Sequence, residues 1–170
     1  MSLANYFASL GRYHVWATQK LIASNLSGLS DEDWHRDCGL FFHSVHNTVN
    51  HLLVTDNIWF ARFAEGKSLR MPLDTVLHAE RAEVCRALGE AVTRWSPWLE
   101  TLSPARYDGD LVYTRNNGDE IRIPFAQALG HAFNHATHHR GQLTAALTAM
   151  VQPGPVLDWV YLLQQEARSS

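Results

Sequence analysis

Three histidines and an arginine lie within residues 135–140, where the sequence reads HATHHR. Imidazole nitrogens are common metal ligands, and two imidazoles four residues apart on a helix share one face, with Cβ atoms about 5–6 Å apart. The pairs His131/His135 and His135/His139 both have this spacing. His138 lies about 60° around the helix from His135, on the side away from His139. Spacing alone therefore leaves the choice of pair open.

A catalytic metal site usually has three protein ligands and an open position, so a third ligand must come from elsewhere in the chain. The segment HSVHNTVNHLLVTD supplies His43, His46 and His51. His51 begins the apolar run HLLV, which favours an inward orientation for its ring. A lone buried histidine is more often a hydrogen-bonded core residue than a ligand. Candidates on two separate segments favour a metal, because the cores of helix bundles often hold one.

Helical hydrophobic periodicity dominates the chain and predicts four long helices. They are expected to span residues 3–25, 42–64, 74–102 and 124–150. Ser2 and Asp74 are candidate N-caps, and Gly66 is expected to end the second helix. Pro97 should kink the third helix or end it early. Four long helices with short connections predict an all-α fold, a four-helix bundle.

Shorter elements are predicted between and after these helices. A capping box at residues 30–33 indicates a short helix, and VLDWVYLLQQ after the stop signal VQPGP indicates an amphipathic tail helix. The β-like runs Leu111–Thr114 and Glu120–Ile123 flank RNNGD, which is a strong hairpin signal. The bundle should therefore carry a small β-hairpin insertion before its last long helix.

The composition limits the classes of function. The chain of 170 residues fits a single domain over residues 1–170, and its net charge of −3 argues against a nucleic-acid partner. No signal peptide and no apolar run of about 20 residues is present, so we expect a cytoplasmic protein without a membrane partner. Cys38 and Cys85 stand far apart, which makes a disulfide framework unexpected.

Three segments of the sequence resemble the DinB family of metalloenzyme-like proteins. They are YHVWATQKLI, NHLLVTDNIWFARF and NHATHHRGQLTAAL. The resemblance implies a homodimeric four-helix bundle that binds one divalent metal ion, first of all zinc or nickel, through His51, His135 and His139. His138 is then a neighbour of the site. The roles of His43, His46 and His131 stay open, and His14 stands where the family often has asparagine.

The reaction is less constrained than the site. No glutamate lies within the H-x-x-x-H motif, which disfavours a zincin-type protease. The resemblance implies chemistry on a small-molecule substrate, in which the metal activates a low-molecular-weight thiol cosubstrate for attack on an electrophile. Metal-dependent hydrolysis is the close competitor, and the alternative is a non-catalytic, damage-inducible metal-binding protein. No catalytic residue is assigned.

Four further polar residues have structural and functional interpretations. Arg140 is expected to make an ion pair or a helix contact, with orientation of an anionic substrate as the alternative. Gln142 is either solvated or a partner for a metal ligand. Asp56 is expected on the surface or pairing helices, with acceptance of an imidazole N–H as the alternative. His14, with Tyr13 before it, could line the mouth of the metal site.

Overall fold

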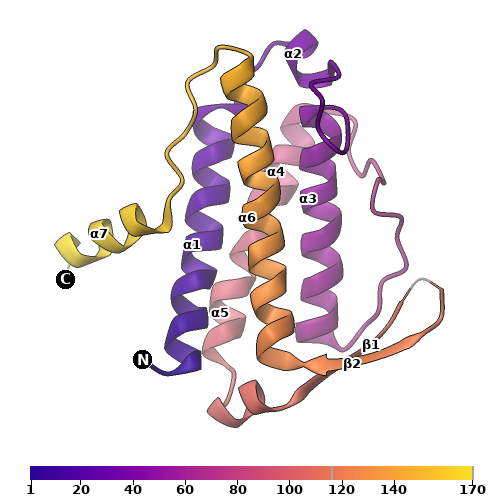
Figure 1. Cartoon of the computed structure of the whole chain (residues 1–170), viewed down its shortest axis with the longest axis vertical. Helices are drawn as coiled ribbons and strands as arrows, with labels where there is room; N and C mark the ends of the chain where they lie inside the picture. Colours follow the sequence, from indigo (N-terminus) through magenta and orange to yellow (C-terminus); the bar gives the residue numbers. More distant parts are fainter. Residues whose placement is uncertain (116, 170) are drawn as a thin grey trace.

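In the computed structural model, which describes residues 1–115 and 117–169, four long helical segments form the predicted bundle (Figure 1). Their bounds are α1 Leu3–Ser24, α3 Val45–Phe60, α4 Arg81–Thr93 continued by α5 Trp95–Glu100, and α6 Phe125–Ala149. In Figure 1, α1 and α6 run upward and α3 and α4 run downward. Residues 66–80 return along the length of the bundle from the end of α3 to the start of α4.

Helix α1 begins and ends close to the predicted bounds. The Oγ of Ser2 accepts a hydrogen bond of 3.2 Å from the backbone N–H of Asn5, which satisfies one of the free donors of the first turn. Phe7, Ala17 and Leu21 are among its buried residues, as the periodicity predicts.

Helix α3 starts three residues later than predicted. His43 has a φ of 67°, in the left-handed region, so the chain turns there and cannot continue a helix from Phe42. Ser44 caps the helix instead, by accepting 3.1 Å from the N–H of Asn47. At its other end α3 passes into a π-helical turn, η2, at Ala61–Glu65, and Gly66 ends it with a φ of 63°, as predicted.

The third long helix departs most from the prediction. It begins at Arg81, so Asp74 is not its N-cap. The buried side chain of Asn50 explains the difference, because its Oδ1 accepts the backbone N–H groups of Leu77 at 2.8 Å and His78 at 3.1 Å. This tertiary contact holds the backbone of residues 77–78 against α3 in a non-helical conformation. The predicted break near Pro97 is present between α4 and α5, where proline has no N–H for the carbonyl of Thr93.

The predicted hairpin precedes α6. Strands β1 (Asp110–Thr114) and β2 (Glu120–Pro124) pair antiparallel, with Leu111 opposite Ile123. The N–H of Gly118 donates to the carbonyl of Arg115 at 3.0 Å across the turn. Residue 116 of the predicted RNNGD turn lies outside the described residues. The hairpin extends sideways from the lower end of the bundle (Figure 1).

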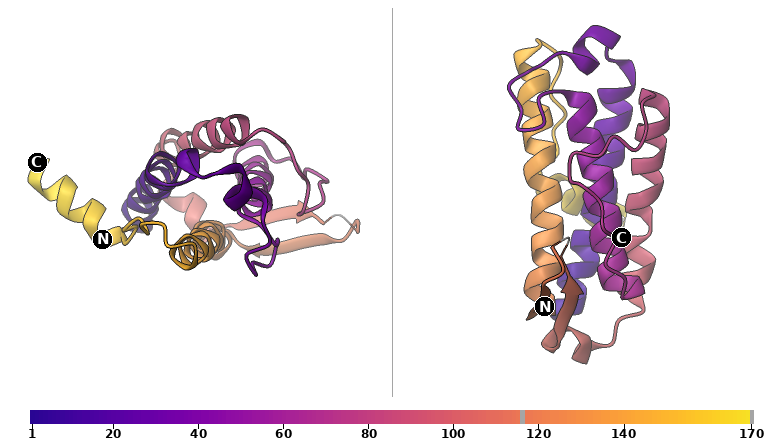
Figure 2. Two further views of the ribbon diagram at one scale, coloured as in Figure 1. Left: turned by 90° about the horizontal axis from the view of Figure 1, so that it is seen from above. Right: turned by 90° about the vertical axis from the view of Figure 1, so that its right-hand side faces the viewer.

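Short elements complete the chain: η1 Leu26–Gly28, α2 Asp31–His35, η3 Pro104–Asp108 and α7 Trp159–Ser169. The predicted tail helix thus begins at Trp159, and it projects away from the bundle on the side opposite the hairpin (Figure 2). Cys38 and Cys85 are free thiols. Within residues 1–115 and 117–169, no helix is both long and apolar enough to cross a lipid bilayer.

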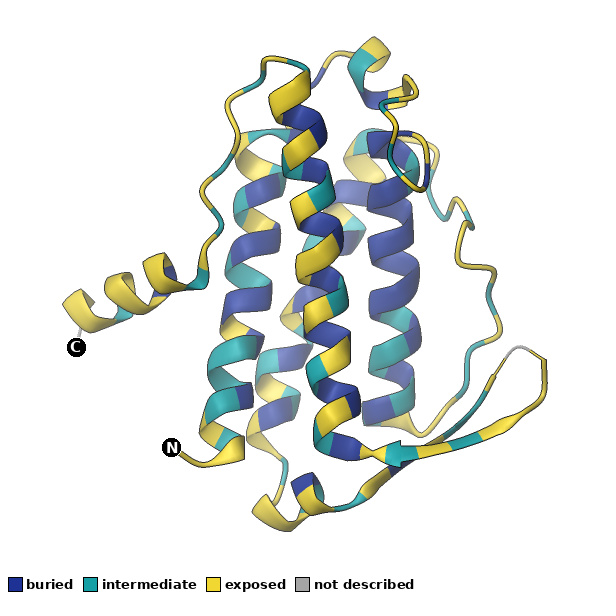
Figure 3. Cartoon of the chain, in the orientation of Figure 1, coloured by how far each residue is buried: buried dark blue, intermediate teal, exposed yellow. Residues whose placement is uncertain are grey.

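Helix α3 is the most deeply buried of the long helices over its first three turns, whereas α7 is mostly exposed (Figure 3). Two of the three apolar clusters among the described residues fill most of the bundle, and the third lies between α1 and α7. One contains Val45, Val49 and Leu143, and the other contains Phe125, Leu129 and Phe133. The polar residues buried along α3 and α6 therefore lie between apolar layers, where each needs a defined partner.

Candidate metal centre

The ring nitrogens of His51, His135 and His139 converge between α3 and α6. The Nε2 of His135 lies 3.4 Å from the Nε2 of His51 and 3.2 Å from the Nε2 of His139. One ligand atom of each residue falls within 4.8 Å of the others. The structure therefore brings together the three histidines that the family resemblance selected.

These separations suit a shared cation. Three nitrogens at zinc–nitrogen distances of about 2.0–2.1 Å in a tetrahedron are separated by about 3.3 Å from one another. The two observed distances of 3.4 and 3.2 Å bracket that value. The cluster is compatible with metal binding, and the identity of an ion does not follow from it, because imidazole suits several divalent metals.

Hydrogen bonds at the opposite ring edges orient two of the three imidazoles. The Nδ1–H of His51 donates to the carbonyl oxygen of Leu73 at 2.7 Å, and the Nδ1–H of His139 donates to the Oε1 of Gln142 at 2.7 Å. Each donation leaves the Nε2 with a lone pair that faces the centre. A neutral His135 can donate one proton to only one of the other rings. At least one Nε2 lone pair in the cluster therefore has no hydrogen-bond donor, and a bound cation would satisfy it.

Phe42 covers one side of the cluster. Its ring stacks on the ring of His51, with centroids 3.9 Å apart and an angle of 24° between the planes. The ring of His139 is 5.8 Å away. The left-handed turn at His43 places Phe42 there, so the irregular start of α3 contributes an apolar wall that sequence periodicity did not reveal.

Burial keeps these imidazoles neutral. It lowers the pKa of His135 to about 3 and that of His139 to about 4, and the neighbouring histidines add repulsion in both cases. Burial also lowers the pKa of His51, although its hydrogen bond to the Leu73 carbonyl opposes that change. At neutral pH all three rings are therefore in the unprotonated form that a metal requires.

The remaining histidines of these segments are not members of the group of three, although His131 and His138 lie beside its rings. His138 is exposed, and its ring contacts that of His139 from outside. His43 is exposed and pairs with Asp37 at 3.3 Å, and the Nε2 of His46 contacts the carbonyl of His78 at 3.2 Å. His131 is exposed with its ring 5.2 Å from that of Trp59. Among the described residues, no carboxylate joins the group of three.

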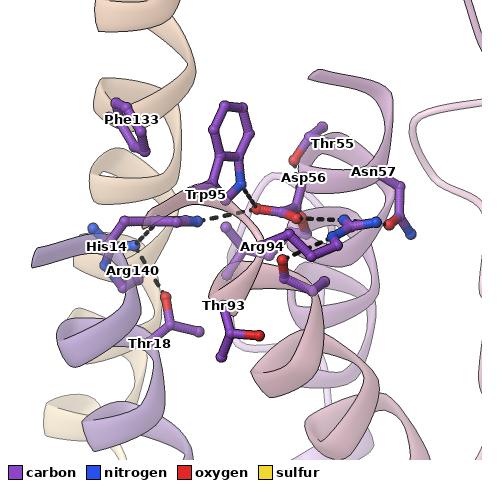
Figure 4. A network of polar contacts seen from close by, with 12 residues as sticks. His14, Thr18, Thr55, Asp56, Asn57, Thr93, Arg94, Trp95, Phe133 and Arg140 are labelled. Atoms are coloured by element: carbon purple, nitrogen blue, oxygen red, sulfur yellow. Dashed lines mark hydrogen bonds and ion pairs between the residues drawn. The ribbon is translucent and has the colours of Figure 1, made fainter. Parts of the chain in front are cut away.

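His14 and Asp56 belong to a different buried site, which Figure 4 shows. The Nε2–H of His14 donates to Asp56 Oδ1 at 3.0 Å, and the Nε1–H of Trp95 donates to the same oxygen at 2.8 Å. Arg94 donates to Asp56 Oδ2 at 2.9 Å. Burial alone would raise the pKa of Asp56, but these donors outweigh it and lower the pKa, so the carboxylate is ionised. Asp56 is buried and joins α3 to α1 and to α5, so the helix-pairing interpretation is confirmed and the surface interpretation is wrong. The imidazole that Asp56 contacts belongs to His14, which is not one of the three proposed ligands.

Arg140 completes this site from α6. It is only 2% exposed, and its guanidinium donates to His14 Nδ1 at 3.1 Å and to Thr18 Oγ1 at 3.2 Å. Because Arg140 donates to Nδ1, that nitrogen carries a lone pair and His14 is neutral. Burial and the charge of Arg140 both lower the pKa of His14. Arg140 thus makes the expected helix contact, and His14 lies in the core and not at the mouth of the metal site.

An open recess adjoins the histidine cluster on the side of the hairpin. Its volume is about 410 Å³, and its lining includes His135 and Leu73, whose carbonyl holds His51. Arg62 from the π-helical turn and Arg115 from the hairpin turn also line it. Sequence reasoning missed these two arginines, because only the folding of the hairpin toward the end of α3 brings them together.

The chain is thus a four-helix bundle with an insertion hairpin and a candidate three-histidine metal site. The chain belongs to the DinB family, whose sequence model matches residues 1–167. It is also similar to Protein DinB of Bacillus subtilis (strain 168), with 25% identity over 150 residues, which cover 85% of this chain and 86% of that protein.

Proposed function

We propose that this chain is a metal-dependent enzyme that binds one divalent ion through His51, His135 and His139 and acts on a small molecule. The observation that carries the proposal is the convergence of three Nε2 atoms beside an open recess lined by His135. An ion held by three imidazoles keeps a coordination position for an exogenous ligand, as in catalytic zinc sites. A closed site with four protein ligands would instead favour a structural role.

The side chains around the cluster have distinct tasks in this proposal. The three rings hold the ion, while the Leu73 carbonyl and Gln142 fix the orientation of two of them. Phe42 excludes water from one side of the rings. When bound, such an ion supplies Lewis acidity that lowers the pKa of a coordinated thiol or water. The chemistry proposed is thiol transfer to an electrophile, with hydrolysis as the competing reaction.

Metal analysis followed by an activity screen tests this function. Protein purified without a histidine tag should contain about one equivalent of a divalent metal, with zinc and nickel the first expected. A panel of low-molecular-weight thiols and electrophiles, with ester and amide substrates in parallel, should reveal turnover that chelation abolishes. His135→Ala should lose both metal and turnover. Stoichiometric metal without turnover in any panel would favour the non-catalytic alternative, and protein without metal affinity would contradict the site.

We propose a second copy of the chain as the macromolecular partner. Three large apolar side chains of the projecting helix α7, Val160, Tyr161 and Leu163, are exposed in the single chain, and burial in a homodimer would remove them from water. Light scattering at micromolar concentration should give twice the mass of one chain. A monomeric mass would contradict the proposal. The cytoplasmic location and the single-domain organisation stay predictions, which fractionation and limited proteolysis would test.

A further inference from the structure

The recess beside His135 has a positively charged wall. Arg62 and Arg115 both line it, and the lining contains no aspartate or glutamate. In the part of the chain that the structure describes, the arginine ion pairs involve other residues, so neither guanidinium has a carboxylate partner. Two cations thus face one cavity whose polar lining offers them no countercharge.

Arg62 is held rigidly at the base of this wall. Its guanidinium lies 4.8 Å from the ring centroid of Trp59 and 4.1 Å from that of Tyr113, so the two aromatic faces position the group. Its buried Nε–H has no hydrogen-bond partner among the described residues. Burial lowers the pKa of Arg62, and the charge of Arg115 contributes to the same change. An arginine stays charged despite such a shift, so this environment favours an added anion.

Local backbone features fix both arginines in place. Arg62 belongs to the π-helical turn Ala61–Glu65, a type of distortion found often at functional sites. Arg115 directly follows β1, and the backbone N–H of Thr114 donates to Ser68 Oγ at 2.9 Å. That hydrogen bond ties the hairpin to the segment after the π-helical turn, and both arginines line the recess between these segments.

We propose that Arg62 and Arg115 form an anion-binding subsite that takes the carboxylate of the small molecule whose other end reaches the three-histidine cluster. Guanidinium groups bind carboxylates through paired, charge-assisted hydrogen bonds. The guanidinium groups of Arg62 and Arg115 supply such donors, and His135 lines the same recess, so a carboxylate bound there lies near the cluster. The link between the carboxylate and the ion rests on the proposed function, whereas the subsite itself does not.

The size of the recess selects the class of ligand. A volume of about 410 Å³ lies within the range of small-molecule sites and is too small for a folded partner. The aromatic rings of Trp59 and Tyr113 and the side chain of Ile58 add apolar surface around the charges. A small organic acid with a short apolar body fits this combination better than an inorganic anion does.

The first test uses metal-free protein, so that it does not depend on the metal site. Propionate should shift the Nε–H resonance of Arg62 in proton–nitrogen NMR spectra saturably, at millimolar concentration and constant ionic strength. Propionamide has the same shape without the charge and should leave the resonance unchanged. Arg115→Gln should weaken the effect of propionate, and Arg122→Gln should not, because Arg122 is exposed on β2 and pairs with Asp110. Equal responses to both compounds, or no response, would overturn the subsite.

The second test joins the subsite to the metal site. Cobalt-substituted protein should bind thioglycolate about tenfold more tightly than mercaptoethanol, as read from thiolate-to-cobalt absorption, because a charge-assisted hydrogen bond contributes about that factor. Arg62→Met and Arg115→Gln should each reduce this ratio toward one while cobalt affinity stays unchanged. A ratio that neither variant alters would overturn the role of the subsite beside the ion.

The two proposals fail in different ways. If cobalt does not bind but propionate still shifts the Arg62 resonance, the proposed function is wrong and the anion subsite stands. If cobalt binds, the two thiols bind the cobalt protein with equal affinities and propionate has no effect, then the metal site stands and the subsite is wrong. Substrates found in the activity screen then show whether the carboxylate belongs to the electrophile or to the thiol. Only the substrate with the carboxylate should bind more weakly to Arg115→Gln.

Discussion

Two groups of buried imidazoles lie in the core of the bundle, and they differ in the partners of their ring nitrogens. In the network of His14, Asp56, Trp95, Arg94 and Arg140, each ring nitrogen of His14 has a partner of opposite polarity. In the cluster of His51, His135 and His139, the outer nitrogens of two rings are satisfied and the inner nitrogens face one another. Burial is common to both groups, so it does not identify a ligand. The convergence of unmatched lone pairs is the feature that makes the second group a candidate metal site.

The comparison also separates two uses of charge. In the network, three side chains donate hydrogen bonds to the ionised carboxylate of Asp56. These donors occupy the positions from which a cation could approach its oxygens. The cluster has no carboxylate among the described residues, and its rings are neutral. We therefore expect the network to contribute stability without metal, and the cluster to contribute stability mainly when an ion is bound.

The largest effect is expected at the centre of the network. Asp56→Ala removes the acceptor of His14, Trp95 and Arg94 and leaves their donors buried, which should lower the free energy of unfolding by about 3–5 kcal/mol. Urea denaturation of metal-free protein measures this loss. Asp56→Asn retains one acceptor oxygen and should lose less, so it serves if the alanine variant does not fold. A loss under about 1 kcal/mol in both variants would show that the network is not a structural element.

Removal of a proposed metal ligand comes next in size. His51→Ala, His135→Ala and His139→Ala should each weaken metal binding more than about a hundredfold, because even the partners of ligands contribute about 10–100-fold. The stability of the metal-free protein should change little. His138→Ala and His46→Ala are matched controls that should retain affinity in chelator competition. Loss of binding in His138→Ala with retention in His139→Ala would mean that α6 presents another face to the ion.

A smaller effect is expected for the residue that orients His139. Gln142→Ala removes the acceptor of the Nδ1–H and should weaken metal binding about tenfold, with little change in stability. Gln127→Ala, at an exposed position on the same helix, should leave the affinity unchanged. Equal affinities of the Gln142 variant and the wild type would show that the hydrogen bond does not orient the ring.

The smallest effect concerns pH. The pKa of a histidine in the unfolded chain is about 6.5, whereas in the folded protein the pKa is about 3 for His135 and about 4 for His139. The unfolded state therefore binds more protons than the folded state at pH values between about 4 and 6.5. The stability of the metal-free protein should therefore fall as the pH is lowered from about 6.5 to about 4. The stability of His135→Ala should fall less steeply, because this variant lacks one of the two titrating rings. The difference in slope between the wild type and the variant should stay below the one-proton limit of about 1.4 kcal/mol per pH unit, because solvent reaches the ring of His135. Denaturation at several pH values tests this, and parallel curves would contradict it.

The helices could be predicted because their apolar periodicity is local. The bounds of α1 and α6 and the hairpin before α6 agree with the sequence to within about two residues. The start of α4 could not be predicted, since the side chain of Asn50 decides it from another helix. The start of α3 depends on a left-handed residue that is not glycine, and sequence patterns give no signal for that.

The candidate ligands of the site could be predicted from the sequence, whereas the groups around them could not. Spacing put candidate ligands on two helices, and the family resemblance chose among them. The Leu73 carbonyl, the ring of Phe42 and the two arginines of the recess come from irregular segments whose positions depend on tertiary contacts. The sequence allowed His14 to line the mouth of the metal site, and only its hydrogen-bond partners show that it belongs to the core.

The three proposed ligands are unequal in their distance along the chain. His135 and His139 are one helical turn apart and meet when α6 forms, which takes about a microsecond in peptides. His51 is 84 residues from His135, and closing that loop carries an entropic cost that is met only as α3 docks. Refolding followed by cobalt absorption should therefore show a two-nitrogen species before the final one, and a single step would argue against this order. For the proposed site, the folding history of the chain, as well as its native geometry, would thus determine when all three rings hold an ion.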